Sequence, residues 1–128
     1  MQDTGISDQV REFLNDHISS VAQLEALLLL QTNSRQGWTS AEIARELRTE
    51  APGTEKQLEL LLAGKLLRRE GETYFYSPAS EQLHATVIAL AQAYLVRRVT
   101  IISLIFAKPS DSLRAFSEAF RLRKEGAP

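Results

Sequence analysis

The feature that most constrains this chain is a helix-starting pair of residues that occurs three times in its first half. The pairs are Ser20 with Gln23, Thr39 with Glu42, and Thr54 with Gln57. In each pair the hydroxyl can accept a hydrogen bond from the amide three residues on, while the Glu or Gln side chain reaches back. Each pair precedes apolar residues spaced by three or four. The sequence therefore predicts three consecutive helices, over residues 20–30, 39–47 and 54–66.

A fourth helix precedes these three, and a turn separates the last two. Ser7 comes before apolar residues that share one helical face, which predicts a first helix to about residue 16. The segment 49–53 contains Pro52 and Gly53, residues that interrupt helices. We therefore expect the helices over 39–47 and 54–66 to be joined by a turn.

After Leu66 the spacing of apolar residues changes from a helical to an extended pattern. Residues 67–70 and 73–77 flank Gly71 and Glu72, which is typical of two short strands joined by a tight turn. The short segment 37–39, which contains an aromatic residue, is a candidate third strand. Ser77 and Pro78 then end the second strand and begin another helix.

The C-terminal half is dominated by a broad apolar helical pattern over residues 80–106. It predicts one helix of about 40 Å, at 1.5 Å per residue. A compact domain of this size cannot cover so wide an apolar surface alone, so a second chain or the N-terminal helix must contribute. Lys108 and Pro109 break the pattern, and a last helix is expected from Ser110.

Composition excludes several classes of function. The chain has 128 residues, no cysteine and a net charge of −1, which excludes a disulfide framework, a thiolate zinc site and a cysteine nucleophile. The polar N-terminus indicates no signal peptide, so a cytoplasmic location is expected. Arg97 and Arg98 interrupt the apolar run after Ala85, and each costs roughly 2.5–3.5 kcal/mol in a bilayer. No membrane association is therefore expected.

The order helix, short strand, helix, turn, helix and hairpin resembles the winged helix-turn-helix fold of MarR-like bacterial regulators. The segment 61–71 is similar to the passage in that family where leucines, a glycine, a hydrophobic pair and basic residues lead from the recognition helix into the wing. The segment 39–47 resembles the first motif helix. The fold expected is mainly α with a small β-hairpin wing and long C-terminal helices. It divides into an N-terminal helix over 1–19, a winged-helix domain over 20–78 and a helical dimerisation region over 79–128.

The resemblance implies a DNA-binding surface. In such folds the second motif helix enters the major groove, and the first crosses the phosphate backbone. Carried over to this chain, the candidate DNA contacts are Thr54, Lys56, Gln57, Arg68, Arg69, Arg45 and Arg48. Alternatives stay open for several of them. Arg45 and Arg48 can instead pair with Glu42, Glu46 or Glu50, and one of the two wing arginines can point inward or pair with Glu70 or Glu72.

The face of the predicted second motif helix is a poor set of base readers. Its core side is leucine-rich, and its outer side carries Lys56, Leu60 and Ala63, flanked by Glu59. Leu60 and Ala63 are therefore candidate protein contacts instead. Strand alternation sends Phe75 to one face of the hairpin and both neighbouring tyrosines to the other, and at least one tyrosine is expected in the core.

The resemblance also implies a two-fold dimer, because MarR-like regulators dimerise through terminal helices. The candidate interface residues are Tyr94, Leu95, Val99, Ile102, Ile105, Phe106, Phe116 and Phe120. The alternative is a monomer in which the terminal helices cover one another.

No arrangement typical of catalysis or of a cofactor is found. His17 and His84 lack ligand-spaced partners, and there is no Gly-rich phosphate loop. We therefore expect no enzyme activity, no metal and no cofactor. The leading hypothesis is a dimeric winged-helix regulator that binds duplex DNA; the alternative is a winged-helix module for protein–protein contacts that binds no DNA.

Overall fold

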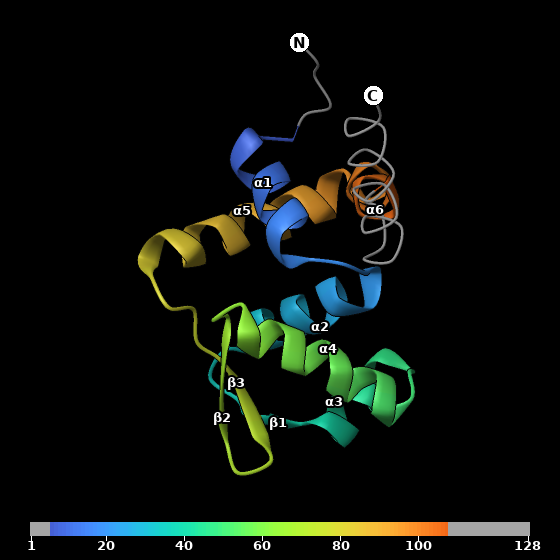
Figure 1. The fold of residues 1–128 in the computed structure, drawn as a ribbon, viewed down its shortest axis with the longest axis vertical. Helices are drawn as coiled ribbons and strands as arrows, with labels where there is room; N and C mark the ends of the chain where they lie inside the picture. Colours follow the sequence, from blue (N-terminus) through green and yellow to red (C-terminus); the bar gives the residue numbers. More distant parts are fainter. Residues whose placement is uncertain (1–5, 108–128) are drawn as a thin grey trace, which may run out of the picture.

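The computed structural model describes residues 6–107, which are mainly α-helical with a small antiparallel sheet (Figure 1). In chain order its elements are α1 (Asp8–His17), α2 (Val21–Thr32), β1 (Trp38–Thr39), α3 (Ser40–Leu47), α4 (Ala51–Ala63), β2 (Leu67–Glu70), β3 (Thr73–Tyr76), α5 (Glu81–Val96) and α6 (Arg98–Ala107). The predicted order of elements up to residue 78 is confirmed. Phe116 and Phe120, and the helix expected from Ser110, lie outside the described residues.

Hydroxyl caps begin four of these helices, three of which the sequence pattern had identified. The hydroxyls of Ser7, Ser20, Thr39 and Ser80 each accept a hydrogen bond from the amide three residues on. At Thr39 the full capping box forms: the Glu42 amide donates to the Thr39 hydroxyl at 3.2 Å, and the Thr39 amide donates to the Glu42 carboxylate at 3.0 Å. Four orphan amides open every helix, and each cap satisfies one of them.

Gln23 does not complete the box expected at Ser20. Its buried amide group turns back to the α1–α2 link, where its Oε1 accepts from the Ser19 amide at 2.9 Å and its Nε2 donates to the His17 carbonyl at 2.6 Å. A buried amide must find partners for its donors and its acceptor, and the link offers both. The side chain therefore fixes how α1 enters α2.

The sheet has three antiparallel strands in the order β1-β3-β2. The candidate strand at 37–39 does pair: Trp38 lies opposite Tyr74 and Thr39 opposite Thr73. In the hairpin, Leu67 lies opposite Tyr76, so alternation places Leu67, Tyr74 and Tyr76 on one buried face. Gly71 turns the hairpin with a φ of +62°, a backbone conformation that suits glycine.

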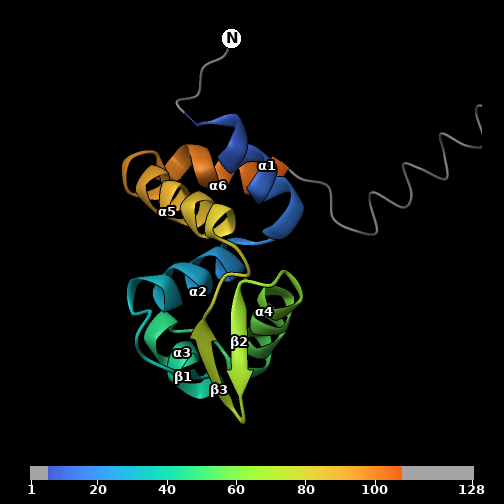
Figure 2. The same ribbon diagram turned by 90° about the vertical axis from the view of Figure 1, so that its left-hand side faces the viewer.

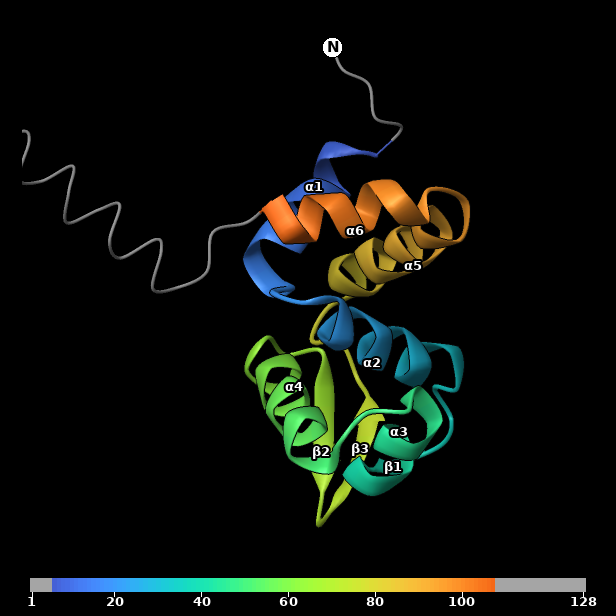
Figure 3. The same ribbon diagram turned by 90° about the vertical axis from the view of Figure 1, so that its right-hand side faces the viewer.

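The elements form two packed groups. The helices α2, α3 and α4 pack with the sheet at one end of the molecule, whereas α1, α5 and α6 pack together at the other (Figures 2 and 3). A single buried cluster runs through both, and α2 lies at the centre with Leu24, Leu27 and Leu30 fully buried. Polar contacts also tie the groups, including the Tyr76 hydroxyl to His84 Nδ1 at 2.8 Å.

The prediction of a single long helix over residues 80–106 is wrong. The helix breaks at Arg97, and α5 and α6 meet with a bend of 114°. A straight helix with apolar residues on most of its circumference would leave half of them in water. The bend instead returns α6 to α1 and α5, where Ile101 and Ile105 become buried.

Candidate nucleic-acid interface

The helix α4 begins three residues earlier than its predicted capping pair. Its first residue is Ala51, Glu50 stands at the N-cap position without a side-chain cap, and Pro52 lies in the first turn, where its missing amide hydrogen costs nothing. Thr54 therefore caps no helix. Its side chain is buried, and its hydroxyl lies 2.8 Å from the Thr49 hydroxyl. This placement removes Thr54 from the candidate DNA contacts, because it does not reach the surface.

The exposed side of α4 carries few groups that can read bases. Lys56 is exposed, but it lies between two exposed carboxylates, Glu55 and Glu59. Leu60 exposes 41% of its surface, and Ala63 is also exposed. These placements agree with the predicted outer face of the helix.

Gln57, the other predicted reader on α4, is half-buried. Its Oε1 accepts a hydrogen bond from the Ser20 hydroxyl at 3.2 Å. It therefore ties the start of α2 to α4 and is not a side chain held out for a base.

The two hairpin arginines lie on opposite faces of β2. Arg68 stacks on Phe75, with 4.3 Å from its guanidinium carbon to the ring centroid, and its Nε donates to the Glu70 carboxylate at 2.8 Å. The Arg69 guanidinium lies over the ring of Tyr74, with 5.4 Å from its carbon to the ring centroid, and its Nε donates to the Gly71 carbonyl at 2.8 Å. Both guanidinium groups are thus oriented by an aromatic ring and one hydrogen bond, yet both residues stay exposed. The expectation that one arginine pairs with Glu70 is confirmed.

Arg45 on α3 and Arg48 at its C-cap are exposed, and the ion pairs suggested for them do not form within the described residues. Glu42 is occupied by the capping box at Thr39. Arg48 ends α3 in the left-handed region, with a φ of +59°, so its side chain leaves the helical face that the expected spacing assumed. Both side chains are available to an anion.

A polar groove lies between α4 and the hairpin, and the sequence pattern gave no sign of it. It has a volume of about 260 Å³ and is lined by Ser40, Glu55, Glu59, Arg69, Glu72 and Tyr74. Arg69 is its single basic residue and lies 3.5 Å from the Glu59 carboxylate. Glu55 also accepts from the Ser40 hydroxyl at 3.2 Å. Three carboxylates against one guanidinium give this groove a negative charge, which repels phosphate.

Exposed apolar side chains lie on both sides of the bend between α5 and α6 and in the last turn of α6. Leu95, Val96, Val99 and Phe106 expose 75–85% of their surfaces, whereas large apolar side chains of a monomer are usually covered. We call these four residues the apolar corner. Three of the predicted dimer residues, Leu95, Val99 and Phe106, belong to it.

The other described dimer candidates face inward. Ile105 is buried, and Ile102 and Tyr94 are half-buried. The Tyr94 hydroxyl donates to Glu25 at 3.4 Å, and Arg98 donates to the same carboxylate at 3.5 Å. Burial, and next the negative charge of Glu25, raise the pKa of Tyr94 above its ordinary value. These contacts hold the end of α5 and the start of α6 against α2, so the bend has turned part of the predicted interface into core.

Comparisons with known proteins return no relative: no family model, no curated protein and no solved structure matches the chain.

The described helices include none that is both long enough and apolar enough to cross a bilayer by itself. Only α5 and α6 taken together reach that length, and they are sharply bent.

Proposed function

We propose that this chain is a winged helix-turn-helix regulator that binds duplex DNA as a homodimer. The element order α2, β1, α3, α4, β2 and β3, with the hairpin beside α4, is the order on which the resemblance to MarR-like regulators rests. The observation that carries the proposal is the pair of exposed, ring-stacked arginines on that hairpin, Arg68 and Arg69. Stacked guanidinium groups lose little freedom on binding phosphate.

In this proposal α4 lies in the major groove and the flanking cations contact the backbone. Lys56 is the one basic residue on the outer face of α4. Arg45 on α3 and Arg48 at its C-cap contact phosphates. The ion pairs of Arg68 with Glu70 and of Arg69 with Glu59 are exposed. Such pairs contribute about 0–1 kcal/mol, so a phosphate can replace the Glu70 carboxylate at small cost, whereas at Arg69 it also meets the negative charge of Glu55 and Glu72.

The homodimer is supported by the apolar corner. Leu95 and Val99 lie on either side of the bend, and a two-fold contact would bury this same surface of both copies against each other. Sedimentation velocity of the full chain tests this: a mass that rises with concentration toward twice the monomer is expected. A monomer at every concentration contradicts the dimer and leaves DNA binding to be judged separately.

A salt series of duplex binding tests the DNA proposal. Contacts to several phosphates release counterions, so affinity should fall steeply as salt rises from about 50 to 200 mM. The double variant R68A/R69A should lose affinity. Because it removes about two phosphate contacts, the slope of log affinity against log salt should become shallower by about 2. Arg11→Ala, on α1 at the far end of the molecule, removes one cation away from the hairpin and is the control for charge loss; it should bind as the parent does (Figure 1). Undetectable binding at about 50 mM salt contradicts the proposal.

A second candidate function is a winged-helix module that contacts another protein. It is favoured by the exposed Leu60 and by the carboxylates of the groove between α4 and the hairpin, because interface centres prefer apolar side chains. Leu60→Arg separates the two functions. It adds a cation to α4, so DNA affinity should hold or rise, whereas a protein contact centred on Leu60 should be lost.

A further inference from the structure

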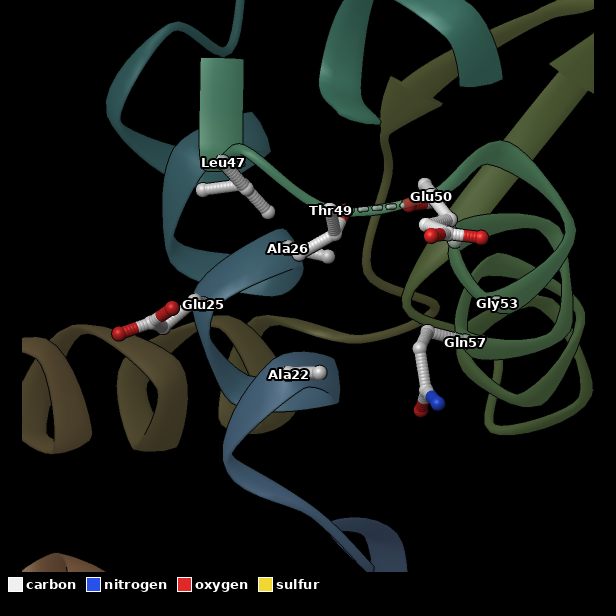
Figure 4. Close-up of a pocket in the computed structure, with 9 residues that line it drawn as sticks. Ala22, Glu25, Ala26, Leu47, Thr49, Glu50, Gly53 and Gln57 are labelled. Carbon is white, nitrogen blue, oxygen red and sulfur yellow. Dashed lines mark hydrogen bonds between the residues drawn. The ribbon is translucent and has the colours of Figure 1, made fainter. Parts of the chain in front are cut away.

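A small pocket lies at the start of α4 (Figure 4), and it shares no lining residue with the groove beside the hairpin. It is enclosed between α2, the turn from α3 to α4, and the first two turns of α4. Its volume is about 140 Å³, and its lining residues include Ala22, Ala26, Leu47, Glu50, Gly53 and Gln57. For scale, an apolar cavity of about 150 Å³ holds one benzene molecule.

The pocket exists because small side chains line both of its helical walls. Ala22 and Ala26 are one turn apart on α2, and Gly53 lies opposite on α4 (Figure 4). A Cβ built on Gly53 meets nothing within 4 Å. Leu47 supplies a larger apolar wall. A hollow lined mainly by hydrocarbon, with a few polar groups at one side, is the usual form of a small-molecule site.

The charge at the rim selects the kind of ligand. Two carboxylates, Glu25 and Glu50, line the pocket, and no basic residue does. Glu25 is already bonded to Tyr94 and Arg98, and in Figure 4 its carboxylate points away from Gln57. Glu50 is exposed and has no ion pair within residues 6–107, although it stands at the N-cap of α4. An anion is therefore disfavoured, and Glu50 is left to pair with a cation.

We propose that this pocket binds a small organic ammonium ion, with a hydrocarbon part of about the size of one aromatic ring. The hydrocarbon part lies against Ala26 and Leu47, and the ammonium group donates to the Glu50 carboxylate at the mouth. The Gln57 amide lies on the same side and offers a further polar contact. The binding itself does not rest on the DNA proposal. If α4 enters DNA, however, the pocket is placed to couple such a ligand to the position of that helix.

Benzylamine is a suitable probe, and the full chain is titrated with it by amide NMR without DNA present. A ligand of this size binds at roughly millimolar affinity. We expect saturable shifts confined to the amides of the pocket, including those of Ala22 and Gly53. Benzyl alcohol, which has the same shape without the charge, should bind more weakly, and benzoate should not bind. Equal binding of all three probes, or no saturable shift at Ala22 and Gly53 with benzylamine, overturns the proposal.

Two variants and one matched control localise the site. Glu50→Gln removes the charge and should weaken benzylamine binding about two- to fivefold, the range of an exposed ion pair. Glu55→Gln removes a carboxylate from the same end of α4 that does not line the pocket, and it should leave the affinity unchanged. Ala22→Leu fills the mouth from an exposed helical position and should abolish binding while the melting temperature is kept. Unchanged affinity in Glu50→Gln, or equal losses in Glu50→Gln and Glu55→Gln, contradicts the assignment.

Discussion

The two ends of this molecule treat their apolar surface differently. At one end α2, α3, α4 and the sheet bury their leucines against one another, and Leu58, Leu61 and Leu66 are fully buried. Leu60 is the only large hydrophobic side chain exposed there among residues 20–78. At the other end α1, α5 and α6 also share a core, yet they leave the four residues of the apolar corner in water.

The difference follows from the position of each helix and from how apolar residues are distributed around it. Helix α2 is also apolar on most sides, but it lies between the two packed groups and is covered. On α3 they occupy one side, so Ile43 and Ala44 are buried while Glu42 and Arg45 face solvent. On α6 they surround the axis, so whichever side is buried, another stays exposed. The first end is therefore complete as a single chain, whereas the second has surface that a further partner can cover.

The largest expected contrast comes from truncating one leucine at each end. Leu61→Ala should lower the free energy of unfolding by about 2–5 kcal/mol, because it leaves a cavity among fully buried neighbours. Leu95→Ala, at 85% exposure, should change it by less than about 0.5 kcal/mol under conditions where the chain is monomeric. Urea denaturation measures both. Similar losses in the two variants would show that the corner is already covered within one chain.

The contact between the two ends should weaken at high pH. Burial raises the pKa of Tyr76 from 10.0 to about 12. The folded state then holds its proton where the unfolded state has lost it, so stability is retained below pH 10 and falls between pH 10 and 12. Because solvent partly reaches the phenol, the loss should be about 1 kcal/mol by pH 12.

Tyr76→Phe checks this assignment. It loses the hydrogen bond to His84 and costs about 1 kcal/mol at neutral pH. It should also remove the Tyr76 part of the decline above pH 10 in urea titrations. A decline of the same steepness in the variant would assign it to other groups.

Helix caps provide a smaller contrast. Thr39→Ala removes a reciprocal capping box at the start of α3 and should cost about 1 kcal/mol, within a usual range of about 0.5–2 kcal/mol. Ser80→Ala removes a single accepted hydrogen bond at the start of α5 and should cost less. Thermal unfolding compares the two variants. The reverse order would mean that α5 depends on its cap more than α3 does.

Two glycines give the smallest effect, with opposite signs. Gly53 lies in α4 with open space around its missing Cβ, so Gly53→Ala should stabilise the fold by about 0.4–1 kcal/mol. Gly71→Ala introduces a side chain where φ is +62° and should destabilise it by about 1 kcal/mol. Urea midpoints measure both changes, and stabilisation by both would contradict the turn geometry of the hairpin.

Local patterns predicted the elements well where one local signal dominates. The box at Thr39 formed because both of its partners lie within four residues, and the hairpin formed because Gly71 suits its turn. Thr54 and Gln57 have the same spacing, but Thr54 does not cap α4, because the helix begins before it. Pro52 allows the helix to begin at Ala51, which takes Thr54 into the core beside Thr49.

The candidate interface was predicted less completely, because its properties depend on contacts between distant residues. The sequence indicated which residues lie on the outer face of α4, including Leu60. It did not indicate that Glu55, Glu59 and Glu72 meet in one groove, because Glu72 comes from the hairpin and the other two from the helix. Nor did it indicate that Arg69 would be held between Tyr74 and Glu59.

By itself, then, the sequence determined the order of the elements from residue 20 to 78, the outer face of α4 and the presence of a hairpin tyrosine in the core, because caps, turns and periodicity act over a few residues. Tertiary structure alone decided where α5 ends and which side of α6 is buried. A segment that is apolar on most of its circumference specifies a helix but not its orientation. The bend at Arg97 and the contacts of α6 with α1 selected Ile101 and Ile105 for the core and left Val99 and Phe106 in solvent.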